Sequence, residues 1–246
     1  MLQTIPEIVA HRGYSYVAPE NTLAAINLAW LVGADAVEID IYLTTDNQIV
    51  LFHDRTTART TGVDLTVSES TLDQLRALDV GKWKGDQWAG EKIPTLEDAL
   101  ATIPEGKRMF VEIKCHSEII PRFVEALDAS GCKDDQVAII SFYEDVIKDI
   151  KAIRPSLEAY WLCCTNRKTS EELIEIAKSS NADGLDAMIC YEFNEEFVSK
   201  ARSAGMGVYV WTVDDDEDAL RMAALGVDGI TTNRPPEIMA LLEGRR

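Results

Sequence analysis

The sequence predicts an α/β fold of the (β/α)8 TIM-barrel type, built as a single domain that spans residues 1–246. Short apolar runs alternate with amphipathic helical segments, a pattern typical of a parallel sheet with right-handed crossover connections. About eight such units can be distinguished, which favours a closed barrel over an open, doubly wound sheet. The GxGxxG pattern of dinucleotide-binding folds does not follow the first apolar run, so that alternative is disfavoured.

Nine apolar runs have the length and composition of strands. They are Glu7–His11, Ala36–Leu43, Gln48–His53, Arg108–Lys114, Gln136–Phe142, Ala159–Cys163, Gly184–Ala187, Val208–Val213 and Gly229–Thr232. Helical periodicity predicts helices at Thr22–Leu31, Leu96–Ile103, Ile119–Ala129, Glu144–Ile153, Ser170–Ser179, Glu195–Ala204, Glu217–Leu225 and Pro236–Leu242. Several of these helices end at glycines, where a left-handed backbone is favoured: Gly33, Gly131, Gly205 and Gly226.

One segment, residues 54–94, interrupts the alternation. It is too long for a simple connection, and it contains Trp83, Trp88, several glycines and a short amphipathic stretch around Leu72–Leu78. We interpret it as a small insertion after an early strand that lies over the mouth of the barrel. Barrel enzymes build their sites on the loops that follow the strands, so such an insertion would shape a substrate pocket. A purely structural excursion is an equally good interpretation.

Composition and charge restrict the partners of the protein. The formal net charge is −18 and the pI about 4.5, so the surface repels nucleic acid and anionic membranes, and we expect neither as a partner. No stretch approaches the ~18 apolar residues of a membrane span, and no signal peptide is evident. The five cysteines lack zinc-type spacing and fit reduced thiols. We therefore expect a cytoplasmic protein that acts on a small molecule.

Glu38 and Asp40 lie two residues apart in an apolar run, so as strand residues they point to the same side. The branched residues Val37, Ile39 and Ile41 would then face the helices, and the two carboxylates would face the barrel interior. Adjacent carboxylates are costly there unless a cation neutralises them, and a hard divalent ion such as Mg²⁺ or Ca²⁺ prefers oxygen ligands. A salt-bridged pair, or a register that exposes both acids, is the alternative.

Glu112 and Lys114 repeat this spacing in a second apolar run, with Val111 and Ile113 on the other side. Glu112 could be a third carboxylate ligand. Lys114 could meet a phosphate oxygen as a point charge, or it could pair with one of the acids. Three acids against one lysine still leave net negative charge, so a bound cation is the simpler account.

His11 and His53 are two of only three histidines in the chain, and each ends a predicted strand. The carboxyl ends of barrel strands converge on one site, so we expect the two imidazoles to meet there. They can divide proton transfer between them, one as base and one as acid. Either can instead ligate a metal, and the spacing does not distinguish these roles.

Arg12 and Trp211 extend the candidate site. Arg12 follows the first of these histidines, and its guanidinium suits a phosphate, while Gly13 permits a close approach of the backbone. By strand alternation, Trp211 shares a face with Tyr209 and Val213. It is either a core residue or an apolar wall for a glycerol or alcohol group.

An ordered set of motifs in this chain resembles the glycerophosphodiester phosphodiesterase family. The motifs are His11-Arg12-Gly13, Pro19-Glu20-Asn21-Thr22, Glu38-Ile39-Asp40, His53-Asp54, Ile93-Pro94-Thr95-Leu96, Glu112-Ile113-Lys114 and Trp211-Thr212-Val213. Their order and spacing match over nearly the whole chain, from Val9 to the region of Asn233.

The resemblance implies a barrel of the phosphatidylinositol phospholipase C type that hydrolyses glycerophosphodiesters. The products would be glycerol 3-phosphate and an alcohol such as choline or ethanolamine, in a reaction of lipid and glycerol metabolism. The resemblance further implies one divalent cation, Mg²⁺ or Ca²⁺, held by Glu38, Asp40 and Glu112. It gives His11 and His53 the roles of general acid and base.

The same resemblance assigns the substrate contacts. Arg12 and Lys114 would bind the phosphate, Asn21 would contact phosphate or metal, and Trp211 would line the pocket for the glycerol or alcohol group. The related phospholipases attack first with a substrate hydroxyl, which implies a cyclic phosphate intermediate. Two alternatives stay open: a phosphodiesterase of the lysophospholipase D type, and a different metal-dependent TIM-barrel enzyme.

Overall fold

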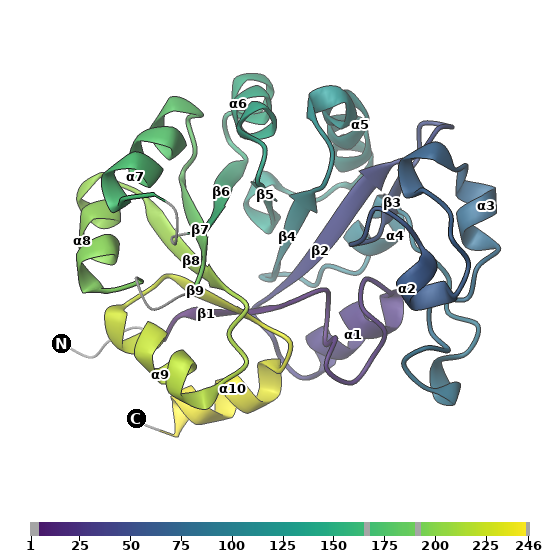
Figure 1. The fold of residues 1–246 in the computed structure, drawn as a ribbon, viewed down its shortest axis with the longest axis horizontal. Helices are drawn as coiled ribbons and strands as arrows, with labels where there is room; N and C mark the ends of the chain where they lie inside the picture. The colour runs from purple at the N-terminus through teal and green to yellow at the C-terminus, as the bar shows by residue number, and fades with distance from the viewer. Residues whose placement is uncertain (1–4, 165–167, 190–192, 245–246) are drawn as a thin grey trace.

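A computed structural model describes residues 5–164, 168–189 and 193–244, and it shows a closed barrel (Figure 1). Within these ranges the barrel strands are β1 (Glu7–Ala10), β2 (Ala36–Leu43), β4 (Arg108–Ile113), β5 (Val137–Ser141), β6 (Glu158–Cys164), β7 (Gly184–Met188), β8 (Gly207–Trp211) and β9 (Gly229–Thr232). All are parallel, and β1 pairs with both β2 and β9, which closes the ring. The predicted (β/α)8 TIM barrel is therefore confirmed.

Helices surround the barrel strands (Figure 1). They are α1 (Leu23–Leu31), α4 (Leu96–Leu100), α5 (Ile120–Ser130), α6 (Glu144–Ile153), α7 (Ser170–Ser179), α8 (Glu195–Ser203), α9 (Asp216–Leu225) and α10 (Pro235–Glu243). Their bounds agree with the predicted ones to within one residue, except that α4 ends at Leu100 instead of Ile103. The glycines predicted to end helices all have positive φ. In the described part of the chain, no helix is both long and apolar enough to cross a membrane.

Two apolar layers fix which side chains point into the barrel. Val37, Ile39 and Ile41 belong to the outer layer between strands and helices, as predicted. The inner layer contains Val9, Ala36, Phe110, Ala138, Ile140, Tyr160, Leu162 and Tyr209. The ring of Phe110 lies 5.0 Å from that of Tyr209 and 6.1 Å from that of Tyr160, measured between centroids. This apolar plug fills the barrel below the carboxyl ends of the strands, so polar residues on the inner face gather above it.

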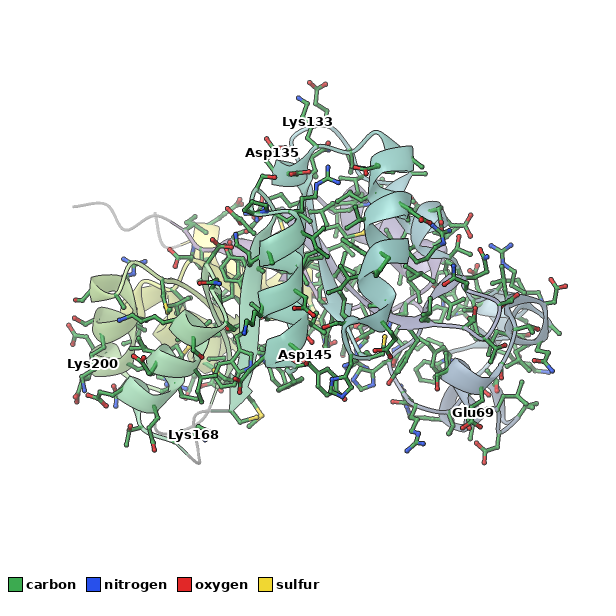
Figure 2. All side chains as sticks on the ribbon, turned by 90° about the horizontal axis from the view of Figure 1, so that it is seen from above. Glu69, Lys133, Asp135, Asp145, Lys168 and Lys200 are labelled. Atoms are coloured by element: carbon green, nitrogen blue, oxygen red, sulfur yellow. The ribbon has the colours of Figure 1, made fainter. Side chains whose placement is uncertain are left out.

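The carboxyl ends of the strands define the mouth of the barrel. Figure 2 shows Lys133 and Asp135, which precede β5, at the opposite end of the molecule from Lys168, which follows β6. Residues that follow a strand therefore lie on the side of Lys168. Barrel enzymes carry their sites at this end.

The third predicted strand, Gln48–His53, is corrected by the structure. Only Ile49–Leu51 forms a strand, β3, and it runs antiparallel to the end of β2, with Ile41 opposite Leu51. β2 extends beyond its neighbour β1, and the chain then turns back through Asn47, which has a φ of 58°. His53 therefore does not end a barrel strand. It follows β3, which among the described strands pairs with β2 alone and lies outside the ring of barrel strands. The Phe52 N–H donates to the Asp40 carbonyl at 3.0 Å, which holds this segment against β2 and brings His53 to the mouth.

Residues 54–94 form a compact segment beside β3 and α1 (Figure 1). It contains the short helices α2 (Ala58–Thr61) and α3 (Leu72–Arg76) and two 3-10 turns, Val67–Glu69 and Asp86–Trp88. A separate apolar cluster joins it to β3 and the residue after it, and its members are Val50, Phe52, Val67, Leu75, Val80 and Ile93. The segment also contacts the loop after β1, because Lys84 Nζ donates to the Ser15 carbonyl at 2.6 Å.

Candidate active site

Three buried carboxylates from adjacent strands meet above the apolar plug. Glu38 and Asp40 lie on β2 and Glu112 lies on β4, where it is the register partner of Asp40. Their exposed fractions are 2%, 0% and 8%, and one oxygen from each lies within 4.8 Å of the others. The three acids therefore point into the barrel, as predicted.

Asp40 is the most fully compensated of the three carboxylates. Lys114 Nζ lies 3.0 Å from its Oδ1, Arg12 Nε lies 3.3 Å from its Oδ2, and Asn21 Nδ2 donates to Oδ2 at 2.7 Å. Burial alone would raise the pKa of Asp40, but the charges of Lys114 and Arg12 hold this pKa well below its usual range. Asp40 therefore stays ionised.

Glu38 and Glu112 have less compensation. Glu38 Oε2 accepts from the Arg12 backbone N–H at 2.9 Å, but its Oε1 is buried and has no hydrogen-bond partner among the described residues. Burial, then the neighbouring charges of Asp40 and Glu112, raise the pKa of Glu38 well above its ordinary value. Burial and Asp40 likewise raise the pKa of Glu112 to about 8, although Lys114 Nζ donates to its Oε1 at 2.6 Å.

This acid triad, Glu38, Asp40 and Glu112, fits a divalent cation. Its ligand atoms are carboxylate oxygens, which hard cations prefer, and one of the Glu38 oxygens accepts no hydrogen bond from the described residues. Lys114 and Arg12 together supply less positive charge than three ionised acids require. A cation would remove the remaining repulsion and allow Glu38 and Glu112 to ionise.

His11 is held by a neutral amide that fixes its tautomer. A carboxylate only accepts, so Asn233 Nδ2 is the donor in its 2.5 Å hydrogen bond to Asp214 Oδ2. This bond orients the amide oxygen of Asn233 toward His11 Nδ1, at 2.8 Å. His11 Nδ1 therefore carries the proton and Nε2 is free to accept one. Burial, then the nearby Arg12 charge, lower the pKa of His11 to about 4, so the ring is neutral at pH 7.

His53 is held by a carboxylate instead. Its Nδ1 lies 2.7 Å from Asp54 Oδ1, so this nitrogen donates and Nε2 is again free. Burial lowers the pKa of His53, and the Asp54 carboxylate opposes that shift. Arg59 Nε donates to Asp54 Oδ2 at 2.5 Å, and its two terminal nitrogens donate to Glu20 at 2.6 and 3.0 Å. Asp54 and Arg59 both belong to the segment of residues 54–94, so this segment supplies the carboxylate that orients the imidazole.

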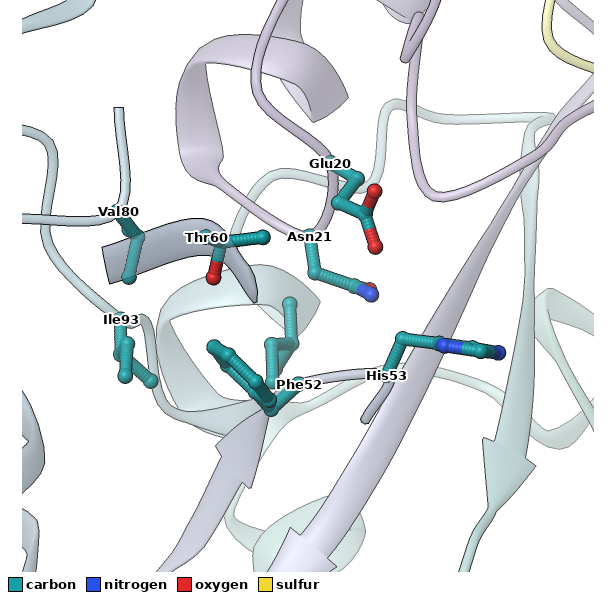
Figure 3. Close-up of a pocket in the computed structure, with 8 residues that line it drawn as sticks. Glu20, Asn21, Phe52, His53, Thr60, Val80 and Ile93 are labelled. Atoms are coloured by element: carbon teal, nitrogen blue, oxygen red, sulfur yellow. The ribbon is translucent and has the colours of Figure 1, made fainter. Parts of the chain in front are cut away.

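Glu20 links these two halves of the site. It also accepts from Arg12 at 2.9 Å, so one carboxylate holds both Arg12 and Arg59. Figure 3 shows the polar ends of Glu20, Asn21 and His53 turned to the same side, away from the apolar Val80 and Ile93. The short connection from His11 to Asn21 is confined by Gly13, with a φ of 80°, where an added Cβ would lie 2.5 Å from the Ala25 carbonyl carbon. The close backbone approach predicted at Gly13 is thus an approach to α1, not to the mouth.

A single pocket of about 130 Å³ brings most of the predicted residues together. The described residues that line it are His11, Arg12, Glu38, His53, Glu112, Lys114, Ile140, Phe142, Leu162, Asp186, Trp211, Thr212 and Thr231. Two predicted site residues, Asp40 and Asn21, do not line it and instead support those that do. His116, to which no role was assigned, lies exposed and contacts Asp145 and Tyr143.

The orientation of Trp211 corrects one prediction. Trp211 packs with Tyr209 against the inner layer, but Val213 belongs to the outer layer. Because β8 ends at Trp211, the alternation does not continue to Val213. Trp211 Nε1 donates to the Asp186 carbonyl at 3.1 Å, which fixes the indole at the pocket wall.

Several residues of this site were not identified from the sequence. Asn233, Asp214 and Arg59 act through hydrogen bonds between distant segments, and no local pattern marks them. Asp186 could have been found, because it is an acid at an alternating position of a predicted apolar strand. It lines the pocket with an exposed fraction of 2%.

A closed barrel with buried acids, cations and two imidazoles at its mouth defines an enzyme of the (β/α)8 class. Residues 11–237 match the model of the glycerophosphoryl diester phosphodiesterase family. The chain belongs to this family, and it is a phosphodiesterase. The resemblance found in the motifs is thereby confirmed.

Relatives and solved structures agree over nearly the full length. The chain is 33% identical to a glycerophosphodiester phosphodiesterase of Caldanaerobacter subterraneus subsp. tengcongensis, over 96% of this chain and 97% of the relative. It is 30% identical to a glycerophosphodiester phosphodiesterase of Bacillus subtilis, over 92% of this chain and 83% of the relative. A phosphodiesterase structure from Oleispira antarctica, in complex with the product sn-glycerol-3-phosphate, is 32% identical with a TM-score of 0.90 and covers 97% of both chains.

The raised pKa of Glu38 leads to a testable prediction about stability. A carboxyl whose pKa is higher in the folded than in the unfolded state favours folding at low pH, and that contribution is lost as pH rises through the folded-state value. Glu38→Gln removes this charge, so the metal-free variant should unfold at a higher temperature than the wild type at alkaline pH. Mg²⁺ should stabilise the wild type more than the variant. Circular dichroism melts with chelator and with Mg²⁺ measure both effects.

Glu69→Gln is the matched control, because Glu69 is exposed and the substitution changes the charge by the same amount. Its melting temperature should follow that of the wild type under both conditions. A Glu38→Gln variant that is less stable than the metal-free wild type at alkaline pH would contradict this account of the acid triad.

Proposed function

We propose that this enzyme hydrolyses glycerophosphodiesters to glycerol 3-phosphate and an alcohol such as choline or ethanolamine, as a step of lipid and glycerol metabolism. The observation that carries the proposal is the pocket that two acids of the triad, two cationic side chains and two imidazoles line together. The product bound in the Oleispira antarctica relative supports the same substrate class.

We propose that Glu38, Asp40 and Glu112 hold one divalent cation, Mg²⁺ or Ca²⁺. When bound, the cation would lower the pKa of a substrate hydroxyl and stabilise negative charge on the phosphate. Asn21 would position Asp40 through the two hydrogen bonds that join them. Arg12 and Lys114 would contact the phosphate through those N–H groups that do not bond to Glu20, Asp40 or Glu112.

The two histidines differ in partner, and we propose that they differ in role. His11 donates to a neutral amide, which favours a neutral ring and suits a general base. His53 donates to Asp54, and a carboxylate stabilises an imidazolium, which suits a general acid. Both free Nε2 atoms would serve for proton transfer.

We propose that the reaction proceeds through a cyclic phosphate. The glycerol 2-hydroxyl loses its proton to His11 and forms a bond to phosphorus. His53 would enter this step as an imidazolium that Asp54 stabilises, and its Nε2 proton passes to the alcohol whose bond to phosphorus breaks. The tethered hydroxyl has a high effective molarity, up to about 10⁵–10⁸ M in well-oriented cases. Water then opens the cyclic phosphate as the two histidines exchange roles. Trp211 would form an apolar wall for the glycerol or alcohol group.

We also propose that residues 54–94 are an insertion within a single domain spanning residues 1–246, and that this insertion supports the site. The contacts of Arg59 with Asp54 and Glu20 support this role. A lysophospholipase D activity would need space for an acyl chain, and the pocket of about 130 Å³ favours a small diester. Membership in the phosphodiesterase family disfavours a different metal-dependent barrel enzyme.

A substrate panel with and without chelator tests this function. Glycerophosphocholine should release glycerol 3-phosphate, measured by coupled oxidation, and the release should stop with EDTA and return with Mg²⁺, Ca²⁺ or Mn²⁺. Asp40→Asn and Glu112→Gln should each weaken the binding of the cation. Full activity of metal-stripped enzyme would remove the cation from the proposal, and preferential cleavage of lysophosphatidylcholine would favour the lysophospholipase D alternative.

Substitution of either imidazole should remove most of the turnover. His11→Ala and His53→Ala should each lower kcat by at least ~10²-fold, the usual contribution of a positioned acid or base. His116→Ala is the matched control, because His116 is exposed and lies outside the pocket lining, and its kcat should stay near that of the wild type. Circular dichroism should show that all three variants fold. Near-normal turnover after either catalytic substitution would show that this histidine has a structural role only.

The cyclic route predicts dependence on the glycerol 2-hydroxyl. A 2-deoxy analogue of glycerophosphocholine should bind as a competitive inhibitor but turn over very slowly, because it lacks the attacking oxygen. Bis(p-nitrophenyl) phosphate should be a poor substrate for the same reason, and glycerol 1,2-cyclic phosphate should be hydrolysed. Hydrolysis of the 2-deoxy analogue at the rate of the parent compound would instead favour direct attack by water.

A further inference from the structure

Asp186 is a buried acid that the proposed chemistry does not use. It lies on β7, lines the pocket, and has an exposed fraction of 2%. Its Oδ1 is buried without a hydrogen-bond partner among the described residues, and no ion pair there involves it. An isolated carboxylate in an apolar site is costly, so its presence in the pocket wall calls for a ligand that compensates it.

The place of Asp186 in the barrel separates it from the acid triad. The closed strand order is β1, β2, β4, β5, β6, β7, β8, β9, so β7 lies across the barrel from β2, which carries Glu38 and Asp40. Asp186 and Glu38 therefore lie on opposite walls of one pocket. A substrate that spans the pocket would place one end near each wall.

The wall around Asp186 is apolar and aromatic. Ile140, Leu162, Phe142 and Trp211 line it, and they come from β5, β6, β8 and the residue after β5. The Phe142 and Trp211 rings meet edge to face, with centroids 5.7 Å apart and an interplanar angle of 87°. A buried acid beside aromatic rings is a favourable environment for an organic ammonium group, because both the charge and the ring faces attract it.

In-line displacement determines which part of the substrate faces this wall. In phosphoryl transfer the attacking and leaving oxygens lie roughly in line, on opposite sides of phosphorus. The attacking glycerol hydroxyl belongs near the acid triad in the proposed function, so the departing alcohol extends away from the triad, toward β7 and β8. The oxygen that His53 protonates stays next to phosphorus in the same pocket.

We propose that Asp186, Trp211 and Phe142 form the subsite for the departing alcohol, and that this subsite selects alcohols with a positively charged amine, such as choline and ethanolamine. This inference rests on the proposed function and names its substrate class. Burial raises the pKa of Asp186 to about 7, and a bound ammonium group would favour the ionised form of this carboxyl.

The test compares two diesters that differ only in charge. One is glycerophosphocholine, and the other carries 3,3-dimethylbutanol, in which carbon replaces the quaternary nitrogen. We expect the wild type to favour the choline diester in kcat/KM by about 10- to 100-fold, measured above the pKa of Asp186. Asp186→Asn keeps the shape of the side chain and removes the charge, so this ratio should fall close to one.

Asp145→Asn is the matched control. Asp145 bonds to the exposed His116, and the substitution removes the same charge from a residue outside the pocket lining. The control should keep the wild-type ratio. Trp211→Leu is a second test of the aromatic wall and should lower the ratio about 3- to 10-fold. Thermal melts should show that Asp186→Asn folds, because no described hydrogen bond depends on the carboxylate.

Two results would overturn the subsite. If wild type and Asp186→Asn have the same ratio, Asp186 does not recognise the charge, whether or not the substitution slows both diesters equally. If the wild type hydrolyses neither diester, the proposed function is wrong and the subsite falls with it. Turnover of both diesters with an unchanged ratio overturns the subsite alone, so the two outcomes are distinguishable.

Discussion

The burial of three carboxylates at one point is the constraint on which the rest of the site depends. Glu38, Asp40 and Glu112 lie directly above an apolar plug, where water cannot screen their charges. Arg12 and Lys114 neutralise mainly Asp40, so the pKa of Asp40 is lowered while those of Glu38 and Glu112 are raised. The unequal compensation leaves a local demand for positive charge. A cation that meets this demand would allow a protein with a net charge of −18 to offer a site to an anionic substrate.

β2 is the strand that organises this arrangement. Its inner face supplies two of the acids, and its end extends beyond β1 to pair with β3. The antiparallel return then brings His53 to the mouth, while His11 comes directly from the end of β1. The two imidazoles thus reach one pocket by different routes, and their partners differ accordingly. A neutral amide holds one ring and a carboxylate holds the other, which gives the pair an asymmetry suited to acid–base exchange.

The segment of residues 54–94 is tied to the site by charge more than by apolar packing. Its apolar cluster packs around β3, whereas its Arg59 makes the contact to Glu20. Glu20 also binds Arg12, so a connected set of ion pairs runs from this segment to the buried Asp40. The free energy that partly buried ion pairs of this kind contribute depends on their geometry. The orientation of His53 therefore depends on residues distant in sequence.

Local patterns in the sequence determined the barrel, the bounds of most helices and the inward direction of Glu38, Asp40 and Glu112, because strand alternation and helical periodicity are set by nearby residues. The motifs also determined the family. Only the tertiary structure decided that β3 runs antiparallel, that Val213 leaves the face of Trp211, and that Asp186 lies across the barrel from β2. It also decided the partner of His11, since Asn233 lies 222 positions from it. Such contacts arise from barrel closure, which joins the first strand to the last, and no local pattern encodes them.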